Sequence, residues 1–137
     1  MEKIKKNLGF GFMRLPMQGE EVDLAQTRQM VDAFLAAGFN YFDTAHGYLK
    51  EKSEIALREC LTSRYPRESY VLADKLTENY FKTETDIRPV LEEQLAACGV
   101  EAGTKRGELI GTIAIGVSVF TNLFFVTLAA VSGVYIL

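Results

Sequence analysis

The sequence predicts an α/β fold of about three βα units, followed by a hydrophobic C-terminal helix. Over residues 9–98 the apolar residues alternate between short strand-like runs and helical spacing, a pattern typical of a parallel sheet with crossover helices. All 15 Lys and Arg residues and all 18 Asp and Glu residues lie at or before Glu108, so residues 109–137 carry no formal charge. The chain therefore consists of two parts of very different composition.

The first βα unit comes at the start of the chain. The run Gly9–Leu15 has the apolar character of a strand, and Pro16 after it cannot donate to a sheet ladder. Asp23 and Gln26 have the spacing of a capping box, which predicts that a helix begins there. Gly38 stands where a helix commonly ends in a left-handed residue. Helical spacing places four apolar residues on one core-facing stripe: Met30, Val31, Phe34 and Leu35.

Two further units follow at similar spacing. An aromatic strand is predicted over Phe39–Asp43, followed by a loop and a helix that begins at Ser53. The third strand is Tyr70–Lys75, and like the second it ends in an ionisable residue. The third helix is predicted from about Asp86 to Cys98, with Pro89 tolerated in its first turn, where the missing N–H is not needed. Functional residues of parallel α/β folds usually lie at the carboxyl ends of strands, so these ends are the first candidates for a site.

Charge and cysteine content exclude several classes of function. The net charge of −3 provides no basic face for a phosphate backbone, so we expect no nucleic-acid partner. Cys60 and Cys98 have no metal-binding spacing and give no disulfide framework, so we expect reduced thiols and no metal site. No apolar run of signal-peptide length follows the basic N-terminal residues, which predicts a cytoplasmic N-terminal part.

Asp43, Tyr48 and Lys75 stand at or just after the ends of two consecutive predicted strands. In a right-handed βαβ arrangement their side chains can converge. An ammonium beside a tyrosine stabilises the phenolate and lowers its pKa from the ordinary value of about 10, and a carboxylate keeps the lysine charged and in place. Such a phenol can protonate a carbonyl oxygen while a nicotinamide cofactor delivers hydride to the carbon. The alternative interpretation is a capping aspartate, an amphipathic loop tyrosine and a solvated strand-end lysine.

Five stretches between about Leu8 and Val100 carry a family resemblance: L-G-F-G-F-M-R-L-P, G-F-N-Y-F-D-T-A-H-G-Y, K-S-E, V-L-A-D-K and L-E-E-Q-L-A-A-C-G-V. Together they closely resemble the aldo/keto reductase family. The resemblance implies a (β/α)8, or TIM, barrel. A complete barrel needs about 250 residues, so this chain is expected to form only a partial one.

The same resemblance implies a reaction and a set of roles. The reaction is the NADP(H)-dependent reduction of aldehydes and ketones, with a small carbonyl compound as substrate. Tyr48 corresponds to the proton donor, Lys75 to the group that lowers the tyrosine pKa, and Asp43 to a residue that supports both the lysine and the cofactor. Met13, in the loop after the first strand, corresponds to a residue that borders the substrate and the nicotinamide.

The chain departs from the family after Val100, where the family has a strand leading to a fourth catalytic residue, a histidine. The single histidine of this sequence, His46, lies inside the D-T-A-H-G-Y loop, and we interpret it as a loop or pocket-rim residue. Most of the dinucleotide site is expected to be missing as well. We therefore expect little or no turnover from this chain alone. Two alternatives are a membrane-tethered, non-catalytic interaction module and a non-functional product of a truncated or frameshifted reductase gene.

The uncharged segment 109–137 exceeds the roughly 20 residues that cross a bilayer as a helix, so it predicts a transmembrane helix. Residues 101–108 would form a polar linker between this helix and a reductase-like part over residues 1–100. Lys105 and Arg106 flank the start of the helix, which places the reductase-like part in the cytoplasm.

Small residues four positions apart in and near this segment would let two such helices associate: Gly107 with Gly111, and Ala114 with Ser118. The alternative to a helix is a pair of buried strands, Val117–Phe120 and Leu123–Leu128, with Thr121 and Asn122 between them.

Overall fold

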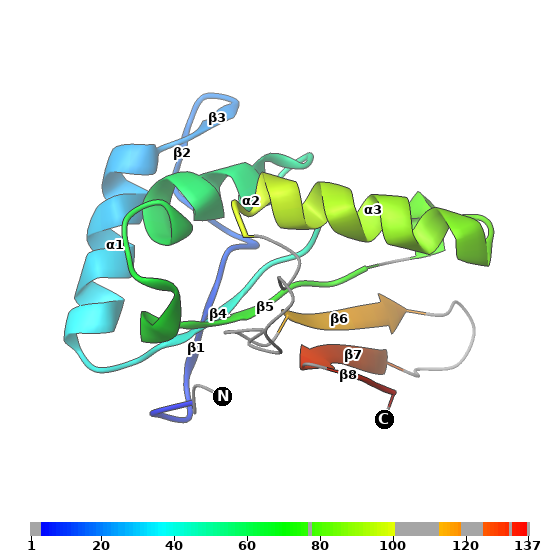
Figure 1. Ribbon diagram of the computed structural model, residues 1–137. Coiled ribbons are helices and arrows are strands. Elements are labelled where there is room, and N and C mark those ends of the chain that lie inside the picture. Colours follow the sequence, from blue (N-terminus) through cyan, green and yellow to red (C-terminus); the bar gives the residue numbers. More distant parts are fainter. Residues whose placement is uncertain (1–3, 77, 101–112, 119–124, 132, 137) are drawn as a thin grey trace.

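A three-stranded parallel sheet forms the centre of the computed structural model (Figure 1). Its strands, in the order β1-β4-β5, are β1 (Gly9–Gly11), β4 (Tyr41–Asp43) and β5 (Val71–Ala73). A helix follows each strand along the chain: α1 (Leu24–Ala36), α2 (Lys52–Leu57) and α3 (Glu84–Ala97). The predicted α/β class with parallel strands is therefore confirmed. The structure describes residues 4–76, 78–100, 113–118, 125–131 and 133–136.

Short elements connect these units. A two-stranded antiparallel ribbon, β2 (Met17–Gln18) and β3 (Glu21–Val22), lies between β1 and α1. Helix α2 continues directly into a π-helical turn, η1 (Arg58–Thr62). Two 3₁₀ turns flank β5: η2 (Arg67–Ser69) before it and η3 (Glu78–Tyr80) after it.

Helix α1 begins and ends where its sequence predicts. The carboxylate of Asp23 accepts a hydrogen bond from the backbone N–H of Gln26 at 2.9 Å, as an N-cap should. Gly38 has a φ of +83°, the left-handed conformation expected just after a helix. One predicted core position is wrong, because Met30 is 38% exposed. The buried stripe of α1 is centred on Thr27 and Val31, and Met30 lies at its margin.

The other predicted boundaries move by a few residues. Strands β1 and β5 pair over three residues each, and so are shorter than the runs predicted from Gly9–Leu15 and Tyr70–Lys75. Helix α3 begins earlier than predicted because Thr83 and Asp86 form a capping box. Pro89 consequently lies in the second helical turn and not in the first. The helical bond that it cannot make would go to the carbonyl of exposed Thr85, which water can satisfy.

The core of the sheet is built around the ring of Phe42, which is fully buried in the central strand. In the sheet register Phe42 pairs with Phe10 on one side and Leu72 on the other. Its ring centroid lies 5.3 Å from that of Phe34 on α1 and 6.4 Å from that of Tyr70, both in edge-to-face contact. This aromatic contact fixes the central strand against α1.

The predicted hydrophobic C-terminal helix is wrong for the described part of the tail. That part forms an antiparallel sheet of β6 (Ile113–Ser118), β7 (Phe125–Val131) and β8 (Gly133–Ile136). Its sequence is rich in β-branched and aromatic residues, which favour strands, and the strand alternative is the one observed, with different bounds and a third strand. Among the described residues no helix is both long and apolar enough to cross a membrane.

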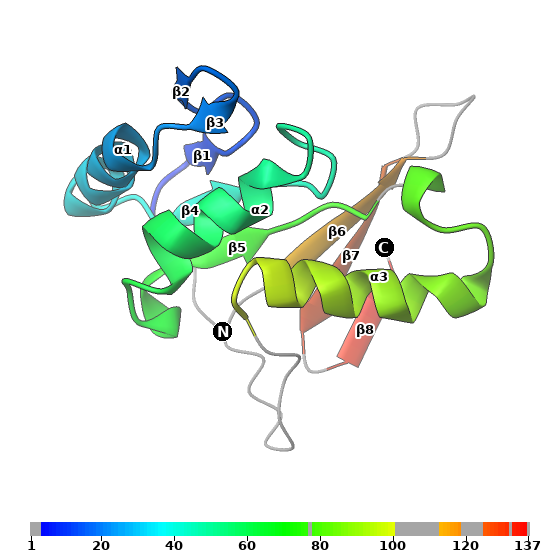
Figure 2. The ribbon, with the colours of Figure 1, turned by 90° about the horizontal axis from the view of Figure 1, so that it is seen from above.

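The other predictions for the tail either depend on the predicted helix, which is not observed, or fall on residues outside the described part. Ala114 and Ser118 belong to strand β6, so they are not part of the predicted helix. The linker 101–108 and the glycines Gly107 and Gly111 fall outside the described residues. Strand β6 lies beside β5, and α3 runs over the tail strands on the same side as α2 covers the parallel sheet (Figure 2).

Replacing Phe42 with alanine tests the core. We expect Phe42→Ala to lower the free energy of unfolding by about 3–5 kcal/mol, because it leaves a cavity among four aromatic rings. Met30→Ala on the half-exposed margin of α1 should cost less than about 1 kcal/mol. Urea unfolding of the full chain measures both, and equal costs for the two variants would contradict this description of the core.

Candidate active site at the ends of strands β4 and β5

An ion pair joins the ends of the two adjacent parallel strands. Asp43 is the last residue of β4, and Lys75 lies two positions beyond the end of β5. Lys75 Nζ donates to Asp43 Oδ1 at 2.5 Å and to the carbonyl of Thr44 at 3.1 Å. Because β4 and β5 are parallel neighbours, these residues meet at the same edge of the sheet. Two of the predicted site residues are therefore in direct contact.

Tyr48 lies in the loop between β4 and α2 and faces the same lysine. Lys75 Nζ lies 5.2 Å from the centroid of the Tyr48 ring, within the range of a cation–π contact. The loop then turns back through three consecutive left-handed residues, with φ values of 53° at Leu49, 56° at Lys50 and 69° at Glu51. For residues with a side chain this conformation costs about 1–2 kcal/mol each. The chain thus accepts local strain directly after the tyrosine, as is common next to functional sites.

The electrostatics of the site keep the lysine protonated. Burial alone would lower the pKa of Lys75, but the hydrogen bond and charge of Asp43, helped by Tyr48, raise the pKa above its ordinary value. The side chains of Lys75 and Asp43 remain 29% and 31% exposed, so a small ligand can reach the pair. The site therefore combines a fixed positive charge, a phenol and an accessible edge.

Met13 lies at the same end of the sheet but is less closely tied to the other three residues. Its neighbour Phe12 donates its backbone N–H to the carbonyl of Asp43 at 2.8 Å, which places the loop after β1 beside the end of β4. The Met13 side chain is 50% exposed. Of the four predicted residues, the structure joins Asp43, Tyr48 and Lys75 and leaves Met13 at the rim.

His46, expected as a loop or pocket-rim residue, lies in that loop but points into the molecule. It is 8% exposed, and its Nδ1 lies 2.8 Å from Glu54 Oε2, so the ring N–H donates to this carboxylate. The ring also packs edge-to-face on Tyr80, with centroids 4.6 Å apart. His46 therefore anchors the loop after β4 to α2 and to Tyr80.

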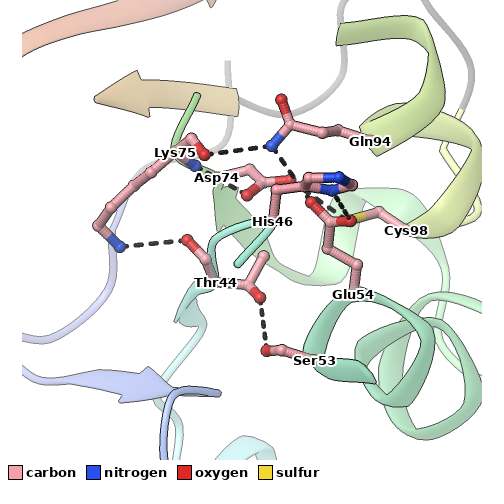
Figure 3. Close-up of polar contacts among 8 residues, drawn as sticks. All are labelled: Thr44, His46, Ser53, Glu54, Asp74, Lys75, Gln94 and Cys98. Atoms are coloured by element: carbon pink, nitrogen blue, oxygen red, sulfur yellow. Dashed lines mark hydrogen bonds and ion pairs between the residues drawn. The ribbon is translucent and has the colours of Figure 1, made fainter. Parts of the chain in front are cut away.

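Sequence reasoning missed a buried polar network directly behind Lys75 (Figure 3). Glu54 on α2 is fully buried, and Gln94 on α3 donates to its Oε1 at 3.2 Å. The same Gln94 amide donates to the carbonyl of Lys75 at 3.2 Å. Asp74 Oδ1 accepts the backbone N–H of Lys75 at 2.7 Å, and Asp74 Oδ2 accepts the thiol of Cys98 at 3.6 Å. The one signal in the sequence was a second charged residue, Asp74, between the apolar run Val71–Ala73 and Lys75.

The two buried carboxyl groups of this network, Glu54 and Asp74, lie close enough for the charge of one to raise the pKa of the other. Burial, followed by the charge and hydrogen bond of Glu54, raises the pKa of Asp74 to about 8. Burial, with the nearby charges of Asp74 and Glu54, also raises the pKa of the Cys98 thiol well above its ordinary range. Burial beside Glu54 therefore favours the protonated form of Asp74.

The same three side chains come close enough to suggest a metal site. Glu54, Asp74 and Cys98 have potential ligand atoms within 4.8 Å of one another. Each of these atoms, however, takes part in the hydrogen bonds to His46, Gln94 or the Lys75 backbone, or in the contacts among the three themselves. We therefore interpret the cluster as a buried hydrogen-bond network.

Comparison with known proteins places this site in a family. The sequence profile of the aldo/keto reductase family matches residues 7–103, a range that contains Asp43, Tyr48 and Lys75. The chain belongs to the aldo/keto reductase family. It is 44% identical over 59 residues to a putative aryl-alcohol dehydrogenase, AAD14, of Saccharomyces cerevisiae, and 37% identical over 59 residues to the aldo-keto reductase ausK of Emericella nidulans. Each alignment covers 43% of this chain, but only 16% and 15% of the relatives.

Solved aldo-keto reductases share the fold. An enzyme from Klebsiella pneumoniae in complex with NADPH superimposes with a TM-score of 0.57 at 18% identity, covering 80% of this chain and 44% of the enzyme. The holo form of an enzyme from Bacillus halodurans superimposes with a TM-score of 0.54 at 28% identity, covering 68% of this chain and 32% of the enzyme. The chain thus spans less than half the length of either enzyme and corresponds to a partial barrel.

The raised pKa of Asp74 predicts how stability depends on pH. An aspartate with a raised native pKa binds its proton more tightly in the folded state than in the unfolded state. Its contribution to stability is therefore full below about pH 4 and is lost as the pH rises toward 8. Asp74→Asn resembles the protonated acid, so its stability should not fall in this way. We expect the stability of the variant relative to the unmodified chain to rise by up to about 1.4 kcal/mol per pH unit in that range.

Urea unfolding of the full chain at several pH values between 4 and 8 measures this difference. The exposed acid Glu93 on α3 provides the control, since Glu93→Gln should follow the unmodified chain. Parallel curves for Asp74→Asn and the unmodified chain would contradict a raised pKa at Asp74.

Proposed function

We propose that Asp43, Tyr48 and Lys75 form the proton-donating part of a site for the NADP(H)-dependent reduction of aldehydes and ketones. The observation that carries this proposal is the position of Lys75 Nζ, 2.5 Å from the Asp43 carboxylate and 5.2 Å from the Tyr48 ring centroid. Family membership and the solved relatives that bind NADPH or NADP support the choice of reaction and cofactor.

The three residues divide the work of a general acid. NADP(H), when bound, supplies hydride to the carbonyl carbon. The hydroxyl of Tyr48 gives its proton to the carbonyl oxygen, which becomes the alcohol of the product. The ammonium of Lys75 stabilises the phenolate left on Tyr48, because an opposite charge nearby favours the ionised form. Asp43 keeps Lys75 protonated and holds it beside the ring.

The strand-end edge is compatible with the nicotinamide end of a dinucleotide. Asp43 and Lys75 are each about a third exposed there, and Met13 is half exposed at the rim. We propose that Met13 and Asp43 border the nicotinamide and the small carbonyl substrate. This edge offers an acceptor, a donor and an apolar thioether within one short stretch of surface.

The chain on its own should be a slow catalyst. Its single histidine, His46, is engaged by Glu54, so it is not free to orient a carbonyl group beside Tyr48. The chain also spans only part of the relatives that carry the activity. We therefore propose an aldo/keto reductase-like part whose proton donor is assembled but whose turnover is impaired.

Oxidation of NADPH in the presence of an aromatic aldehyde tests this function. We expect the full chain to show a slow rate above the buffer background. Tyr48→Phe and Lys75→Met should lower that rate by about 100-fold or more, because general acid catalysis commonly contributes 10²–10⁴-fold.

Tyr65→Phe provides the matched control, since Tyr65 donates its hydroxyl to Asp32, away from the strand-end site. Its rate should stay close to that of the unmodified chain. A rate that Tyr48→Phe leaves unchanged, or no rate above background for the unmodified chain, would contradict the proposal.

A further inference from the structure

We propose that Gln94, held in place by the buried carboxylate of Glu54, is a positioning residue that fixes the backbone of Lys75 at the reacting edge. This inference rests on the proposed function, because it assigns the lysine to the reaction. It concerns residues on α2 and α3 that do not touch the reacting groups themselves.

The backbone of Lys75 lies beyond the end of the β5 ladder, so its polar groups need other partners. Side chains supply both. The Gln94 amide donates to the Lys75 carbonyl at 3.2 Å, and the Asp74 carboxyl accepts the Lys75 N–H at 2.7 Å. Figure 3 shows the Gln94 amide and the Asp74 carboxyl beside the Lys75 backbone, each joined to it by a hydrogen bond. Two side chains therefore replace the sheet hydrogen bonds that the strand end lacks.

Glu54 determines where the Gln94 amide can lie. Its Oε1 accepts the second hydrogen bond of the same amide nitrogen at 3.2 Å, and its Oε2 is occupied by His46 at 2.8 Å. Since Glu54 is fully buried, its charge depends on these donors, and loss of either would be costly. The carboxylate thus ties α3 to α2 and to the loop that carries Tyr48.

Burying the amide of Gln94 costs free energy, and the packing of its side chain does not explain why a polar residue stands there. Gln94 is 2% exposed, and its Oε1 has no hydrogen-bond partner among the residues that the structure describes. An unsatisfied buried polar group is destabilising, and an apolar side chain beside Leu95 would avoid this cost. What the glutamine provides in return is a pair of hydrogen bonds, one to buried Glu54 and one to the backbone of Lys75. A lysine side chain has a long flexible stem, so an anchored backbone limits where its ammonium can go.

The test compares Gln94→Leu with the unmodified full chain by NMR titration of the Lys75 side chain, assigned with Lys75→Met. Leucine removes both donated hydrogen bonds with little change in volume. We expect the pKa of Lys75 to fall by about half a unit or more, because the ammonium spends less time beside Asp43. We also expect the NADPH-dependent rate to fall at least tenfold with little change in KM. Gln29→Leu, at an exposed glutamine of α1, is the matched control and should change neither value.

An unchanged Lys75 titration in folded Gln94→Leu would overturn the positioning role, whatever the rate. If Gln94→Leu does not fold, Gln94→Asn carries the test, because its shorter side chain withdraws the amide from the Lys75 carbonyl while staying polar. An unchanged titration there overturns the role equally. A shifted titration together with a rate that does not depend on Tyr48 would uphold the positioning of Lys75 and reject the proposed function instead.

Discussion

Glu54 is a fully buried carboxylate that needs hydrogen-bond donors, and the elements around the candidate site are positioned to supply them. Its two oxygens accept hydrogen bonds from His46 in the loop after β4 and from Gln94 on α3. A charge removed from water is tolerated only with such partners, and removing one of them leaves an uncompensated charge. The hydrogen bonds to Glu54 therefore hold α2, α3 and the loop after β4 in fixed positions. Gln94, fixed in this way, in turn positions the backbone of Lys75 at the end of β5.

The ion pair at the exposed edge of the site differs from the buried network around Glu54 in how much it contributes to stability. Asp43 and Lys75 form an ion pair that is about a third exposed, so solvent screens it and its contribution to stability is modest. Its value is positional: the pair sets where a positive charge stands relative to the ring of Tyr48. Stability comes mainly from the aromatic core around Phe42, while the exposed edge stays accessible to a ligand.

The sequence predicted features that depend on local or strongly patterned signals. The cap at Asp23, the left-handed Gly38 and the meeting of Asp43 with Lys75 all follow from spacing and from the topology of parallel strands. It did not predict the roles of Glu54 and Gln94. In a helix such residues usually face water, and only the packing of α2 against α3 buries them. The residues that they hydrogen-bond are distant in the sequence, so no local sequence pattern predicts these contacts.

The tail was misinterpreted for a related reason. Residues 109–137 satisfy the length and hydropathy of a membrane helix, and their strand propensity was the weaker signal because it depends on neighbours to pair with. An open parallel sheet has such a need at its edge, since its outer strand leaves backbone groups and apolar surface uncovered. Strand β6 lies beside β5, and β6, β7 and β8 pair with one another as a separate sheet under α3. An uncharged segment can therefore satisfy its backbone by pairing its own strands beside the edge of the parallel sheet, a solution that hydropathy alone cannot distinguish from burial in lipid.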